Sequence, residues 1–419
     1  MRVVVINTGT ELLLGDVLNS HLAFIAREIF PLGLRVDRQI TVPDGEAIRD
    51  AIAESLATAD IAFITGGLGP TTDDITREVT AELLGLRLVH DPIVLRAIEE
   101  RAVKRGFRLT DRVARQATVP EGATVLPNEH GSAPGLYLPA NTEPKRPHLF
   151  LLPGPPRELH PMFRSSVLPL LREIVPSENA VERRVIRIAG LGESLVEEAV
   201  GQQLVALPGL ELGYCAHAGS VDLRLMGAAS VVAQAAELVT QKLGSAIFSD
   251  DGSNLETVVV RVLTEQKRTV AVAESCTGGY LAHRITNVPG SSAVFLGGCV
   301  TYSNEAKVTM LGVNLALIER HGAVSQQVAA AMAEGALENT KADFALATTG
   351  IAGPTGGTDE KPVGTVFIAL AAKDRPVSVQ KRFFPDDRPT FKELATQAAL
   401  EMLRRRLLSE FTSSSDVIR

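Results

Sequence analysis

The stretch Thr269-Val-Ala-Val-Ala-Glu-Ser-Cys-Thr-Gly-Gly279 indicates a strand that turns into a helix. Residues 269–273 are apolar and rich in β-branched side chains, and Leu281 and Ile285 then recur at helical spacing. Such a turn lies at the carboxyl edge of a sheet, where the free N–H groups that open a helix can hold a phosphate or a developing oxyanion. We therefore expect Ser275 at the edge of an α/β sheet, in a position suited to catalysis.

Ser275 requires a base to act as a nucleophile, and the segment Tyr302-Ser-Asn-Glu-Ala-Lys307 offers one. Lys307 is the candidate, because no nearby histidine suggests the usual triad. It would have to be neutral, which requires burial or a neighbouring cation to lower its pKa. Tyr302 could relay the proton. The alternative is a simple helix cap at Ser275 and a solvated surface charge at Lys307. Cys276 is a competing nucleophile, which we expect to point into packing instead.

A further strand, residues 344–348, runs into the glycine-rich loop Ala347-Thr-Thr-Gly-Ile-Ala-Gly-Pro354. Ligands of open α/β sheets bind beyond the carboxyl ends of the strands. The segments that carry Ser275, Lys307 and Thr349 are therefore expected to line one crevice. Thr349 and the Gly350 amide would suit an amide oxygen or a phosphate. Together the three segments favour an amide hydrolase over the structural alternative.

The first part of the chain alternates strands and helices. Strands are expected at residues 3–6, 35–41 and 61–65, and apolar residues recur at helical spacing within residues 22–29 and 48–56. This β-α-β-α-β order predicts a parallel sheet covered on both faces. The predicted fold class is therefore α/β, with two three-layer α/β domains joined by a small α+β domain.

Two glycine-containing loops at the edge of this first sheet indicate a metal and phosphate site. They are Gly66-Gly-Leu-Gly-Pro-Thr-Thr-Asp-Asp74 and Asn7-Thr-Gly-Thr-Glu-Leu-Leu-Leu-Gly-Asp16. Glycines let backbone amides approach a ligand, and carboxylates could hold a divalent cation, whether magnesium, manganese or cobalt, that offsets the charge of a pyrophosphate. For Asp73 and Asp74, the candidate metal ligands, capping of the following helix is the alternative. The candidate site residues are Glu11, Asp16, Asn19, Gly66, Gly67, Gly69, Asp73 and Asp74.

Residues 177–250 follow a different pattern. A strand is expected at residues 184–188, a helix at 194–204, two strands within 212–226 and a helix at 231–243. This order is typical of a small β-α-β-β-α domain. Residues 249–254 are a plausible linker to the last domain, and residues 411–419 are expected to form a flexible tail.

The composition excludes several classes of function. A net charge of −7 argues against sequence-independent binding to nucleic acid, which relies on basic surface. Cys215, Cys276 and Cys299 form neither an even set nor a metal-like spacing, which favours a reducing, cytoplasmic compartment. No apolar run approaches the ~18 residues that a membrane-spanning helix needs. We expect a cytoplasmic protein with no membrane partner and no direct nucleic-acid binding, and a homodimer as the common default.

Five motifs in the second half, AESCTGG, VPGSS, YSNEAK, TTGIAGP and FPDDR, resemble the nicotinamide-nucleotide amidohydrolase domain of the CinA family, over residues 253–410. The resemblance implies hydrolysis of nicotinamide mononucleotide to nicotinic acid mononucleotide and ammonia without a cofactor. Ser275 would be the nucleophile, with Tyr302 and Lys307 as its activating partners. A guanidinium also matches a phosphate in bidentate fashion, although Arg388 could instead pair with Asp386 or Asp387. The substrate-binding residues would be Thr277, Gly278, Gly279, Ser292, Thr349, Gly350 and Arg388.

Residues 1–170 resemble the molybdenum-cofactor-biosynthesis type of domain of the same family, through GTELLLGDVLNS and GGLGPTTDDIT. The resemblance implies a metal-dependent ADP-ribose pyrophosphatase that yields AMP and ribose 5-phosphate. Residues 128–135 and 152–158 also match that domain. Residues 177–250 resemble a KH-type fold, but Gly190-Leu-Gly-Glu193 places an acid where an RNA clamp would need positive charge, which favours a spacer or a dimer surface.

The predicted function is a two-site enzyme of pyridine-nucleotide salvage that acts on nicotinamide mononucleotide and on ADP-ribose. Three alternatives stay open. Only one of the two sites is active, or the protein is a non-catalytic partner in DNA uptake or damage responses. A molybdopterin-binding role is the third, because a shared fold does not fix function.

Overall fold

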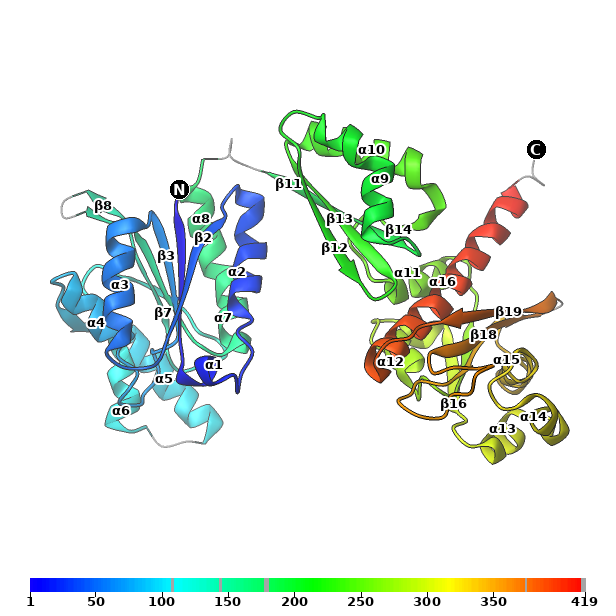
Figure 1. Cartoon of the computed structure of the whole chain (residues 1–419). Helices are drawn as coiled ribbons and strands as arrows, with labels where there is room; N and C mark the ends of the chain where they lie inside the picture. The colour runs from blue at the N-terminus through cyan, green and yellow to red at the C-terminus, as the bar shows by residue number, and fades with distance from the viewer. Residues whose placement is uncertain (107–108, 143–144, 177–180, 374, 416–419) are drawn as a thin grey trace. The chain divides into compact units, whose positions relative to one another are not determined.

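The computed structural model describes residues 1–106, 109–142, 145–176, 181–373 and 375–415 (Figure 1). The chain forms two compact units, Met1–Glu182 and Arg183–Arg419. The first is an α/β domain, and the second combines a small α+β domain with a second α/β domain. In the described part of the chain, no helix is both long and apolar enough to span a membrane.

The first unit is built on a six-stranded sheet in the order β2-β1-β3-β10-β7-β6. The strands β1 (Val3–Thr8), β2 (Val36–Val42), β3 (Ile61–Thr65) and β10 (His148–Leu152) run parallel, which confirms the predicted parallel core. The strands β7 (Gly135–Leu138) and β6 (Thr124–Leu126) add an antiparallel edge that the sequence did not predict. Antiparallel neighbours need no crossover helix, and the segments that join these strands are too short to hold one.

Both faces of this sheet are buried, as the prediction required. Successive residues of β1 pack on opposite sides: Val5 joins Ile25 of α2 (His21–Ile29), whereas Ile6 joins Ile52 of α3 (Ala47–Thr58). The remaining elements are α1 (Thr10–Leu14), η1 (Phe30–Leu32), α4 (Thr76–Leu83), β4 (Leu88–His90), α5 (Pro92–Arg105), α6 (Asp111–Ala114), η2 (Arg115–Ala117), β5 (Thr118–Pro120), β8 (Asn141–Thr142), β9 (Lys145–Arg146), α7 (Pro156–Met162), η3 (Phe163–Val167) and α8 (Leu168–Ile174).

The small domain of the second unit has the predicted β-α-β-β-α order and one further strand. Its four-stranded sheet has the order β12-β13-β11-β14. The added strand β14 covers only Ile247–Ser249, which is too short for a sequence pattern to reveal it. The other elements are β11 (Glu182–Ala189), α9 (Glu193–Val205), β12 (Glu211–His217), β13 (Ser220–Gly227), α10 (Ala229–Leu243) and η5 (Gly244–Ala246).

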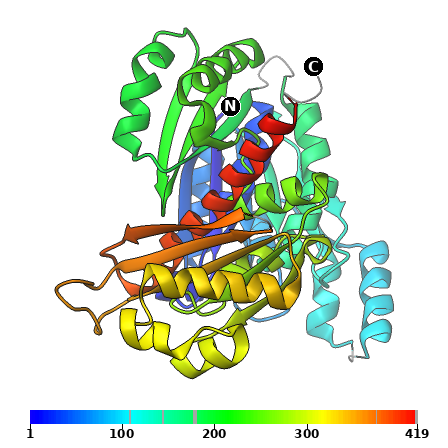
Figure 2. The same ribbon diagram turned by 90° about the vertical axis from the view of Figure 1, so that its right-hand side faces the viewer.

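The last domain has a five-stranded sheet in the order β16-β15-β17-β18-β19. The first three strands are parallel and the last two antiparallel. Figures 1 and 2 show α16 (Arg388–Ser415) packed along one face, beside α11 (Leu255–Glu265), while α15 (Gln326–Thr340) covers the other face. The other elements are β15 (Val270–Glu274), α12 (Tyr280–Thr286), η6 (Ser291–Ala293), β16 (Phe295–Val300), α13 (Asn304–Leu311), α14 (Leu315–His321), β17 (Phe344–Gly350), β18 (Thr365–Ala372) and β19 (Arg375–Phe383).

The end of the chain differs from the expected flexible tail. Helix α16 continues through Ser415, so the segment 411–419 begins inside a helix. Residues 416–419 lie outside the described residues. On the same helix, the buried Arg404 donates hydrogen bonds to the carbonyl oxygens of Ser245 and Ile247, at 2.7 and 3.2 Å, which ties the last domain to the small one.

Candidate functional site

Three loops of the last domain meet at one edge of its sheet, as predicted. In the register of the parallel strands, Glu274 at the end of β15 lies opposite Val300 of β16 and Thr348 of β17. The residue that follows each of them therefore emerges at the same carboxyl edge. These residues are Ser275, Thr301 and Thr349.

Ser275 and Lys307 are in contact at this edge. Lys307 lies on α13, and its Nζ donates hydrogen bonds to Ser275 Oγ at 3.1 Å and to the Thr301 carbonyl oxygen at 2.8 Å. The lysine is only 1% exposed, so the alternative of a solvated surface charge is excluded. Burial lowers the pKa of Lys307, because the charged amine loses its hydration. The geometry gives the serine hydroxyl a buried amine as its neighbour.

A buried carboxylate organises the turn that carries Ser275. The Glu274 side chain, which is fully buried, accepts hydrogen bonds from the backbone N–H groups of Gly279, Leu281 and Ala282 at 3.0, 3.0 and 2.8 Å. The expectation that the amides opening this helix are free for a phosphate was therefore wrong for these three. Within the described part of the chain, the amides of Cys276 and Thr277 have no acceptor. Because Thr277 is fully buried, the Cys276 amide is the remaining candidate for an oxyanion hole.

The side chains next to Ser275 point into the protein. Cys276 packs in the core, as expected, and burial raises the pKa of its thiol to about 12. The Thr277 hydroxyl lies 2.7 Å from that of Thr348, and the whole residue is buried, so the structure does not support the substrate contact predicted for Thr277. Gly278 and Gly279 have φ of 60° and 92°, which other residues adopt only with strain. They shape the turn.

Tyr302 and Arg388 form a pair beside the serine. Arg388 Nη2 donates a hydrogen bond to the Tyr302 hydroxyl at 2.6 Å, and Arg388 Nη1 donates one to the Gly353 carbonyl oxygen at 2.9 Å. Tyr302 is 61% exposed and makes no hydrogen bond with Ser275 or Lys307 among the described residues, which argues against a proton relay in this conformation. The alternative of an ion pair between Arg388 and Asp387 is not adopted either, since that carboxylate caps α16 through Thr390.

Two predicted substrate residues are placed differently from the expectation. Ser292 lies in η6, before the amino end of β16, where Phe295 pairs with Val270. Ser275 follows the opposite end of these strands, roughly 15 Å away at about 3.3 Å per residue, so within one chain Ser292 does not reach it. The Thr349 hydroxyl donates to the Ala323 carbonyl oxygen at 2.8 Å and keeps only its acceptor capacity for a ligand; Gly350 follows it at the sheet edge.

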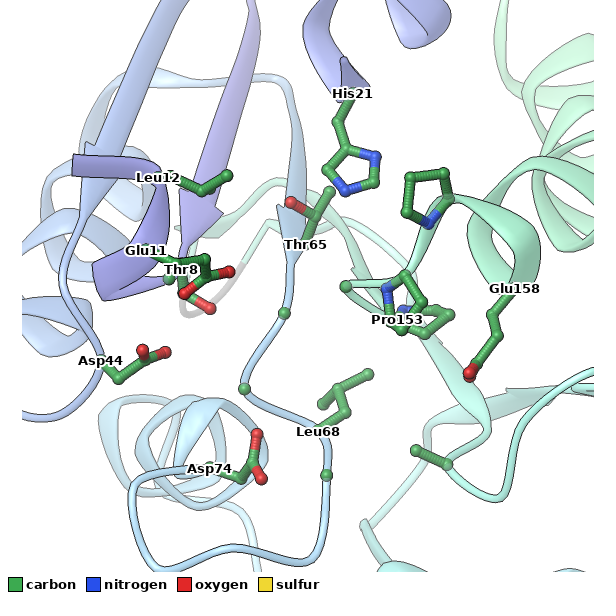
Figure 3. Close-up of a pocket in the computed structure, with 18 of the residues that line it drawn as sticks. Thr8, Glu11, Leu12, His21, Asp44, Thr65, Leu68, Asp74, Pro153 and Glu158 are labelled. Carbon is green, nitrogen blue, oxygen red and sulfur yellow. The ribbon is translucent and has the colours of Figure 1, made fainter. Parts of the chain in front are cut away.

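The first unit contains a cavity of about 480 Å³ at the predicted glycine loops (Figure 3). Glu11, Gly66, Gly67, Gly69 and Asp74 all line it, as the sequence suggested. Figure 3 shows Glu11, Asp44 and Asp74 on one side and Glu158 on the other.

Three predicted residues do not line this cavity. Asn19 instead donates a hydrogen bond to Asn7 Oδ1 at 3.0 Å and holds the start of α2. Asp16 and Asp73 are exposed, and a hydrogen bond from Thr71 lowers the pKa of the Asp73 carboxyl. The cavity therefore does not support a direct contact of these three side chains with a ligand.

The charge of the cavity bears on the expected metal. Four carboxylates line it, and none of the described lining residues is a lysine or arginine. Within the described ranges, however, no three His, Cys, Asp or Glu side chains come close enough together to hold a metal ion. Asp74 accepts hydrogen bonds from the Thr71 amide, at 2.9 Å, and from its hydroxyl. The residues suit a magnesium-like ion that binds one or two carboxylates and takes its other oxygens from water and phosphate.

Comparison with known proteins finds family models that match each of the three domains of the chain. Residues 252–407 match the family model of the CinA C-terminal domain, residues 4–173 that of the probable molybdopterin binding domain, and residues 183–248 that of the damage-inducible protein CinA KH domain. A CinA-like protein of Akkermansia muciniphila is 45% identical over 400 residues, 96% of each chain. A putative competence-damage inducible protein of Moorella thermoacetica is 42% identical over 98% of this chain and 100% of that one. The chain belongs to the CinA family.

Solved structures of competence/damage-inducible proteins are also similar to part of this chain. The crystal structure of competence/damage inducible protein CihA from Agrobacterium tumefaciens is 42% identical and covers 36% of this chain and 96% of that one, with a TM-score of 0.35.

Several residues near the two CinA sites escaped the sequence analysis. Glu274 lies inside the AESCTGG motif without a predicted role, although its place before the nucleophile at a strand end was a usable signal. The others line the cavity of the first unit: Thr8 and Glu158 lie inside the stretches 7–16 and 152–158 but were given no role, and the rest carry no local motif. They are Thr8, His21, Asp44, Gln116 and Glu158.

Proposed function

We propose that the last domain hydrolyses nicotinamide mononucleotide to nicotinic acid mononucleotide and ammonia. The observation that carries the proposal is the 3.1 Å contact between Lys307 Nζ and Ser275 Oγ, made by a buried amine. A lowered pKa increases the neutral fraction of Lys307, and only the neutral amine can accept the serine proton. The amide-hydrolase chemistry follows from this pair.

In the proposed reaction, Lys307 takes the Ser275 proton as Oγ attacks the carboxamide carbon. The carbonyl oxygen becomes an oxyanion, for which we propose the Cys276 amide as a donor, since it makes no backbone hydrogen bond among the described residues. Lys307 then returns the proton to the leaving nitrogen, the C–N bond breaks and ammonia departs. Water, deprotonated by the same amine, cleaves the resulting serine ester. The Thr301 carbonyl oxygen holds the amine toward the serine throughout.

The phosphate of the substrate is assigned to Arg388. Its present partners, the Tyr302 hydroxyl and the Gly353 carbonyl oxygen, are neutral, so its charge is available to an anion. Tyr302 then acts by orienting the guanidinium rather than by moving a proton. This changes the role that the sequence suggested for Tyr302.

Ammonia release from nicotinamide mononucleotide tests the proposal directly. Ser275→Ala is expected to abolish the release, while Cys276→Ala, which alters the neighbouring buried thiol, is expected to retain it. Loss of activity in Cys276→Ala with activity retained in Ser275→Ala would reject the assigned nucleophile. No ammonia from the unaltered protein would favour a non-catalytic role for this domain.

We propose a second activity for the first unit, the hydrolysis of ADP-ribose to AMP and ribose 5-phosphate with a divalent cation. The supporting observation is a cavity lined by four carboxylates and, among its described lining residues, no lysine or arginine. A bound cation would polarise the pyrophosphate and offset its charge, and Glu11, Asp44 and Asp74 are the residues on its side of the cavity. AMP release with magnesium, manganese or cobalt tests this activity. Asp74→Asn should reduce AMP release and leave ammonia release unchanged.

A further inference from the structure

Three residues that line the cavity of the first unit each bury a polar atom without a hydrogen-bond partner in the described part of the chain. The atoms are Thr8 Oγ1, His21 Nδ1 and Gln116 Oε1. Their residues are 7, 7 and 1% exposed. Buried polar atoms in folded proteins are nearly always paired, and an unpaired one is costly. Three around one cavity indicate that a ligand completes them.

The neighbouring contacts fix what these atoms can offer. Gln116 Nε2 donates to the Leu68 carbonyl oxygen at 3.3 Å, which leaves Oε1 as an acceptor. Burial lowers the pKa of His21, and a hydrogen bond to the backbone of Gly154 acts in the opposite direction. The neutral ring therefore uses its one N–H at Gly154 and presents Nδ1 as an acceptor. The Thr8 hydroxyl can donate or accept.

The rest of the polar lining is rich in acceptors as well. Glu11, Asp44, Asp74 and Glu158 contribute carboxylates, and the described lining includes no lysine or arginine. A phosphate has only acceptor oxygens and cannot pair with an acceptor without a cation between them. The ligand groups that pair with His21 Nδ1 and Gln116 Oε1 must therefore be hydrogen-bond donors, and a hydroxyl can pair with Thr8 as well. In ADP-ribose the sugar hydroxyls are the most abundant donors.

We propose that His21 and Thr8 bind ribose hydroxyls of a nucleotide in this cavity and so select for the sugar rather than for the phosphates. The identity of the nucleotide as ADP-ribose rests on the second activity proposed above. The position of His21 is fixed from both sides: its amide donates to Asn19 Oδ1 at 3.2 Å, and its ring meets the Gly154 backbone. This gives Asn19, which does not line the cavity, a supporting role.

A binding experiment on the full chain tests the assignment. The parent probe is the α,β-methylene analogue of ADP-ribose, which cannot be cleaved. Two further probes are deoxy forms of it, one without the hydroxyls of the adenosine ribose and one without those of the terminal ribose. Magnesium is present throughout. Calorimetry should find that His21→Phe raises the Kd of the parent probe about tenfold, as for one lost hydrogen bond. The Kd of one of the two deoxy forms should change less than twofold. Equal weakening of all three probes, or no weakening, would overturn the assignment.

Two further variants guard against a misfolded His21→Phe. Thr8→Val removes only an unpaired hydroxyl, so it should not lower the melting temperature while it weakens the parent probe severalfold. His160→Phe is the matched control for packing beside His21. His160 acts on the charge of His21 and stacks on Phe24, with ring centroids 3.8 Å apart, but does not line the cavity. This variant should bind all probes like the unaltered protein. A loss of binding in His160→Phe equal to that in His21→Phe would reduce the effect to packing and overturn the proposal.

The inference and the proposed activity fail separately. Binding with the expected dependence on the hydroxyls, but no AMP from ADP-ribose, would reject the pyrophosphatase and keep the sugar recognition. Release of AMP by a protein whose binding does not depend on the ribose hydroxyls would keep the pyrophosphatase and reject the sugar recognition. A protein that binds none of the probes and releases no AMP from ADP-ribose would reject both.

Discussion

Replacing Lys307 by methionine removes the proposed base while keeping a side chain of similar length. A positioned general base contributes ~100- to 10,000-fold in rate, so kcat for ammonia release should fall by that factor, equivalent to about 3–5 kcal/mol in the activation free energy. KM for nicotinamide mononucleotide should change little, because Lys307 is 1% exposed and lies behind the serine. Steady-state rates of ammonia release provide the measurement.

The pH dependence of the same variant provides a second, independent result. Activity of the unaltered protein should rise with pH as Lys307 loses its proton, with a midpoint below the usual lysine value of 10.5. The folded pKa is lowered, so the unfolded chain binds this proton more tightly, and stability should also rise with pH between the folded pKa and 10.5. Lys307→Met should lose both the rise in activity and this contribution to stability.

Folding controls separate chemistry from damage. Methionine avoids burying an amine but leaves the Thr301 carbonyl oxygen without its donor, a cost of ~1–3 kcal/mol that opposes the gain. The melting temperature near neutral pH should therefore stay close to that of the unaltered protein. Retention of kcat within threefold, or an unchanged pH profile in Lys307→Met, would refute the role of this amine.

Four further results are expected. Cys276→Ala should keep ammonia release within about twofold, and thiol reagents at neutral pH should not inhibit the protein, because the buried thiol has a pKa of about 12. The Glu274 carboxylate accepts hydrogen bonds from three backbone amides, and Glu274→Gln replaces one of its oxygens with an NH₂ donor. The free energy of unfolding should fall by ~1–3 kcal/mol, measured by denaturant titration. Arg388→Ala should raise KM for nicotinamide mononucleotide about 10- to 100-fold. KM for nicotinamide riboside, which lacks the phosphate, should stay unchanged. A chelator should stop AMP release and leave ammonia release intact; inhibition of both would contradict a metal-free serine site.

The sequence predicted the contact between Ser275 and Lys307 because both follow strands that end at the same edge of a parallel sheet. Alternation of strands and helices fixes that edge without knowledge of the strand order. The same rule, applied strictly, would have excluded Ser292, since it precedes a strand and lies at the amino edge. Its predicted role came instead from the resemblance of the VPGSS motif to the family. Strand and helix periods thus place a residue at an edge, while a motif alone does not.

The interior of the first cavity was beyond the reach of local patterns. Thr8, His21 and Gln116 lie on β1, α2 and η2, and only the packed chain shows that they line one space and lack partners. The direction of a single side chain was equally hidden. Asp73 and Asp74 are adjacent in sequence, yet only Asp74 lines the cavity, because consecutive residues of a turn point different ways.

Under the two proposed functions, the sites would bind an anionic nucleotide in opposite ways. Beside Ser275, the guanidinium of Arg388 has only neutral partners, so a monophosphate can bind to the protein directly. In the first unit, carboxylates such as Glu11 and Asp74 would repel a pyrophosphate, and a cation must come with it. A cation at the serine site would instead raise the cost of protonating Lys307 and compete for the phosphate. The serine site offers a positive side chain, and the cavity of the first unit offers negative ones. The two proposed hydrolyses, one with a metal ion and one without, would therefore not depend on the same ion.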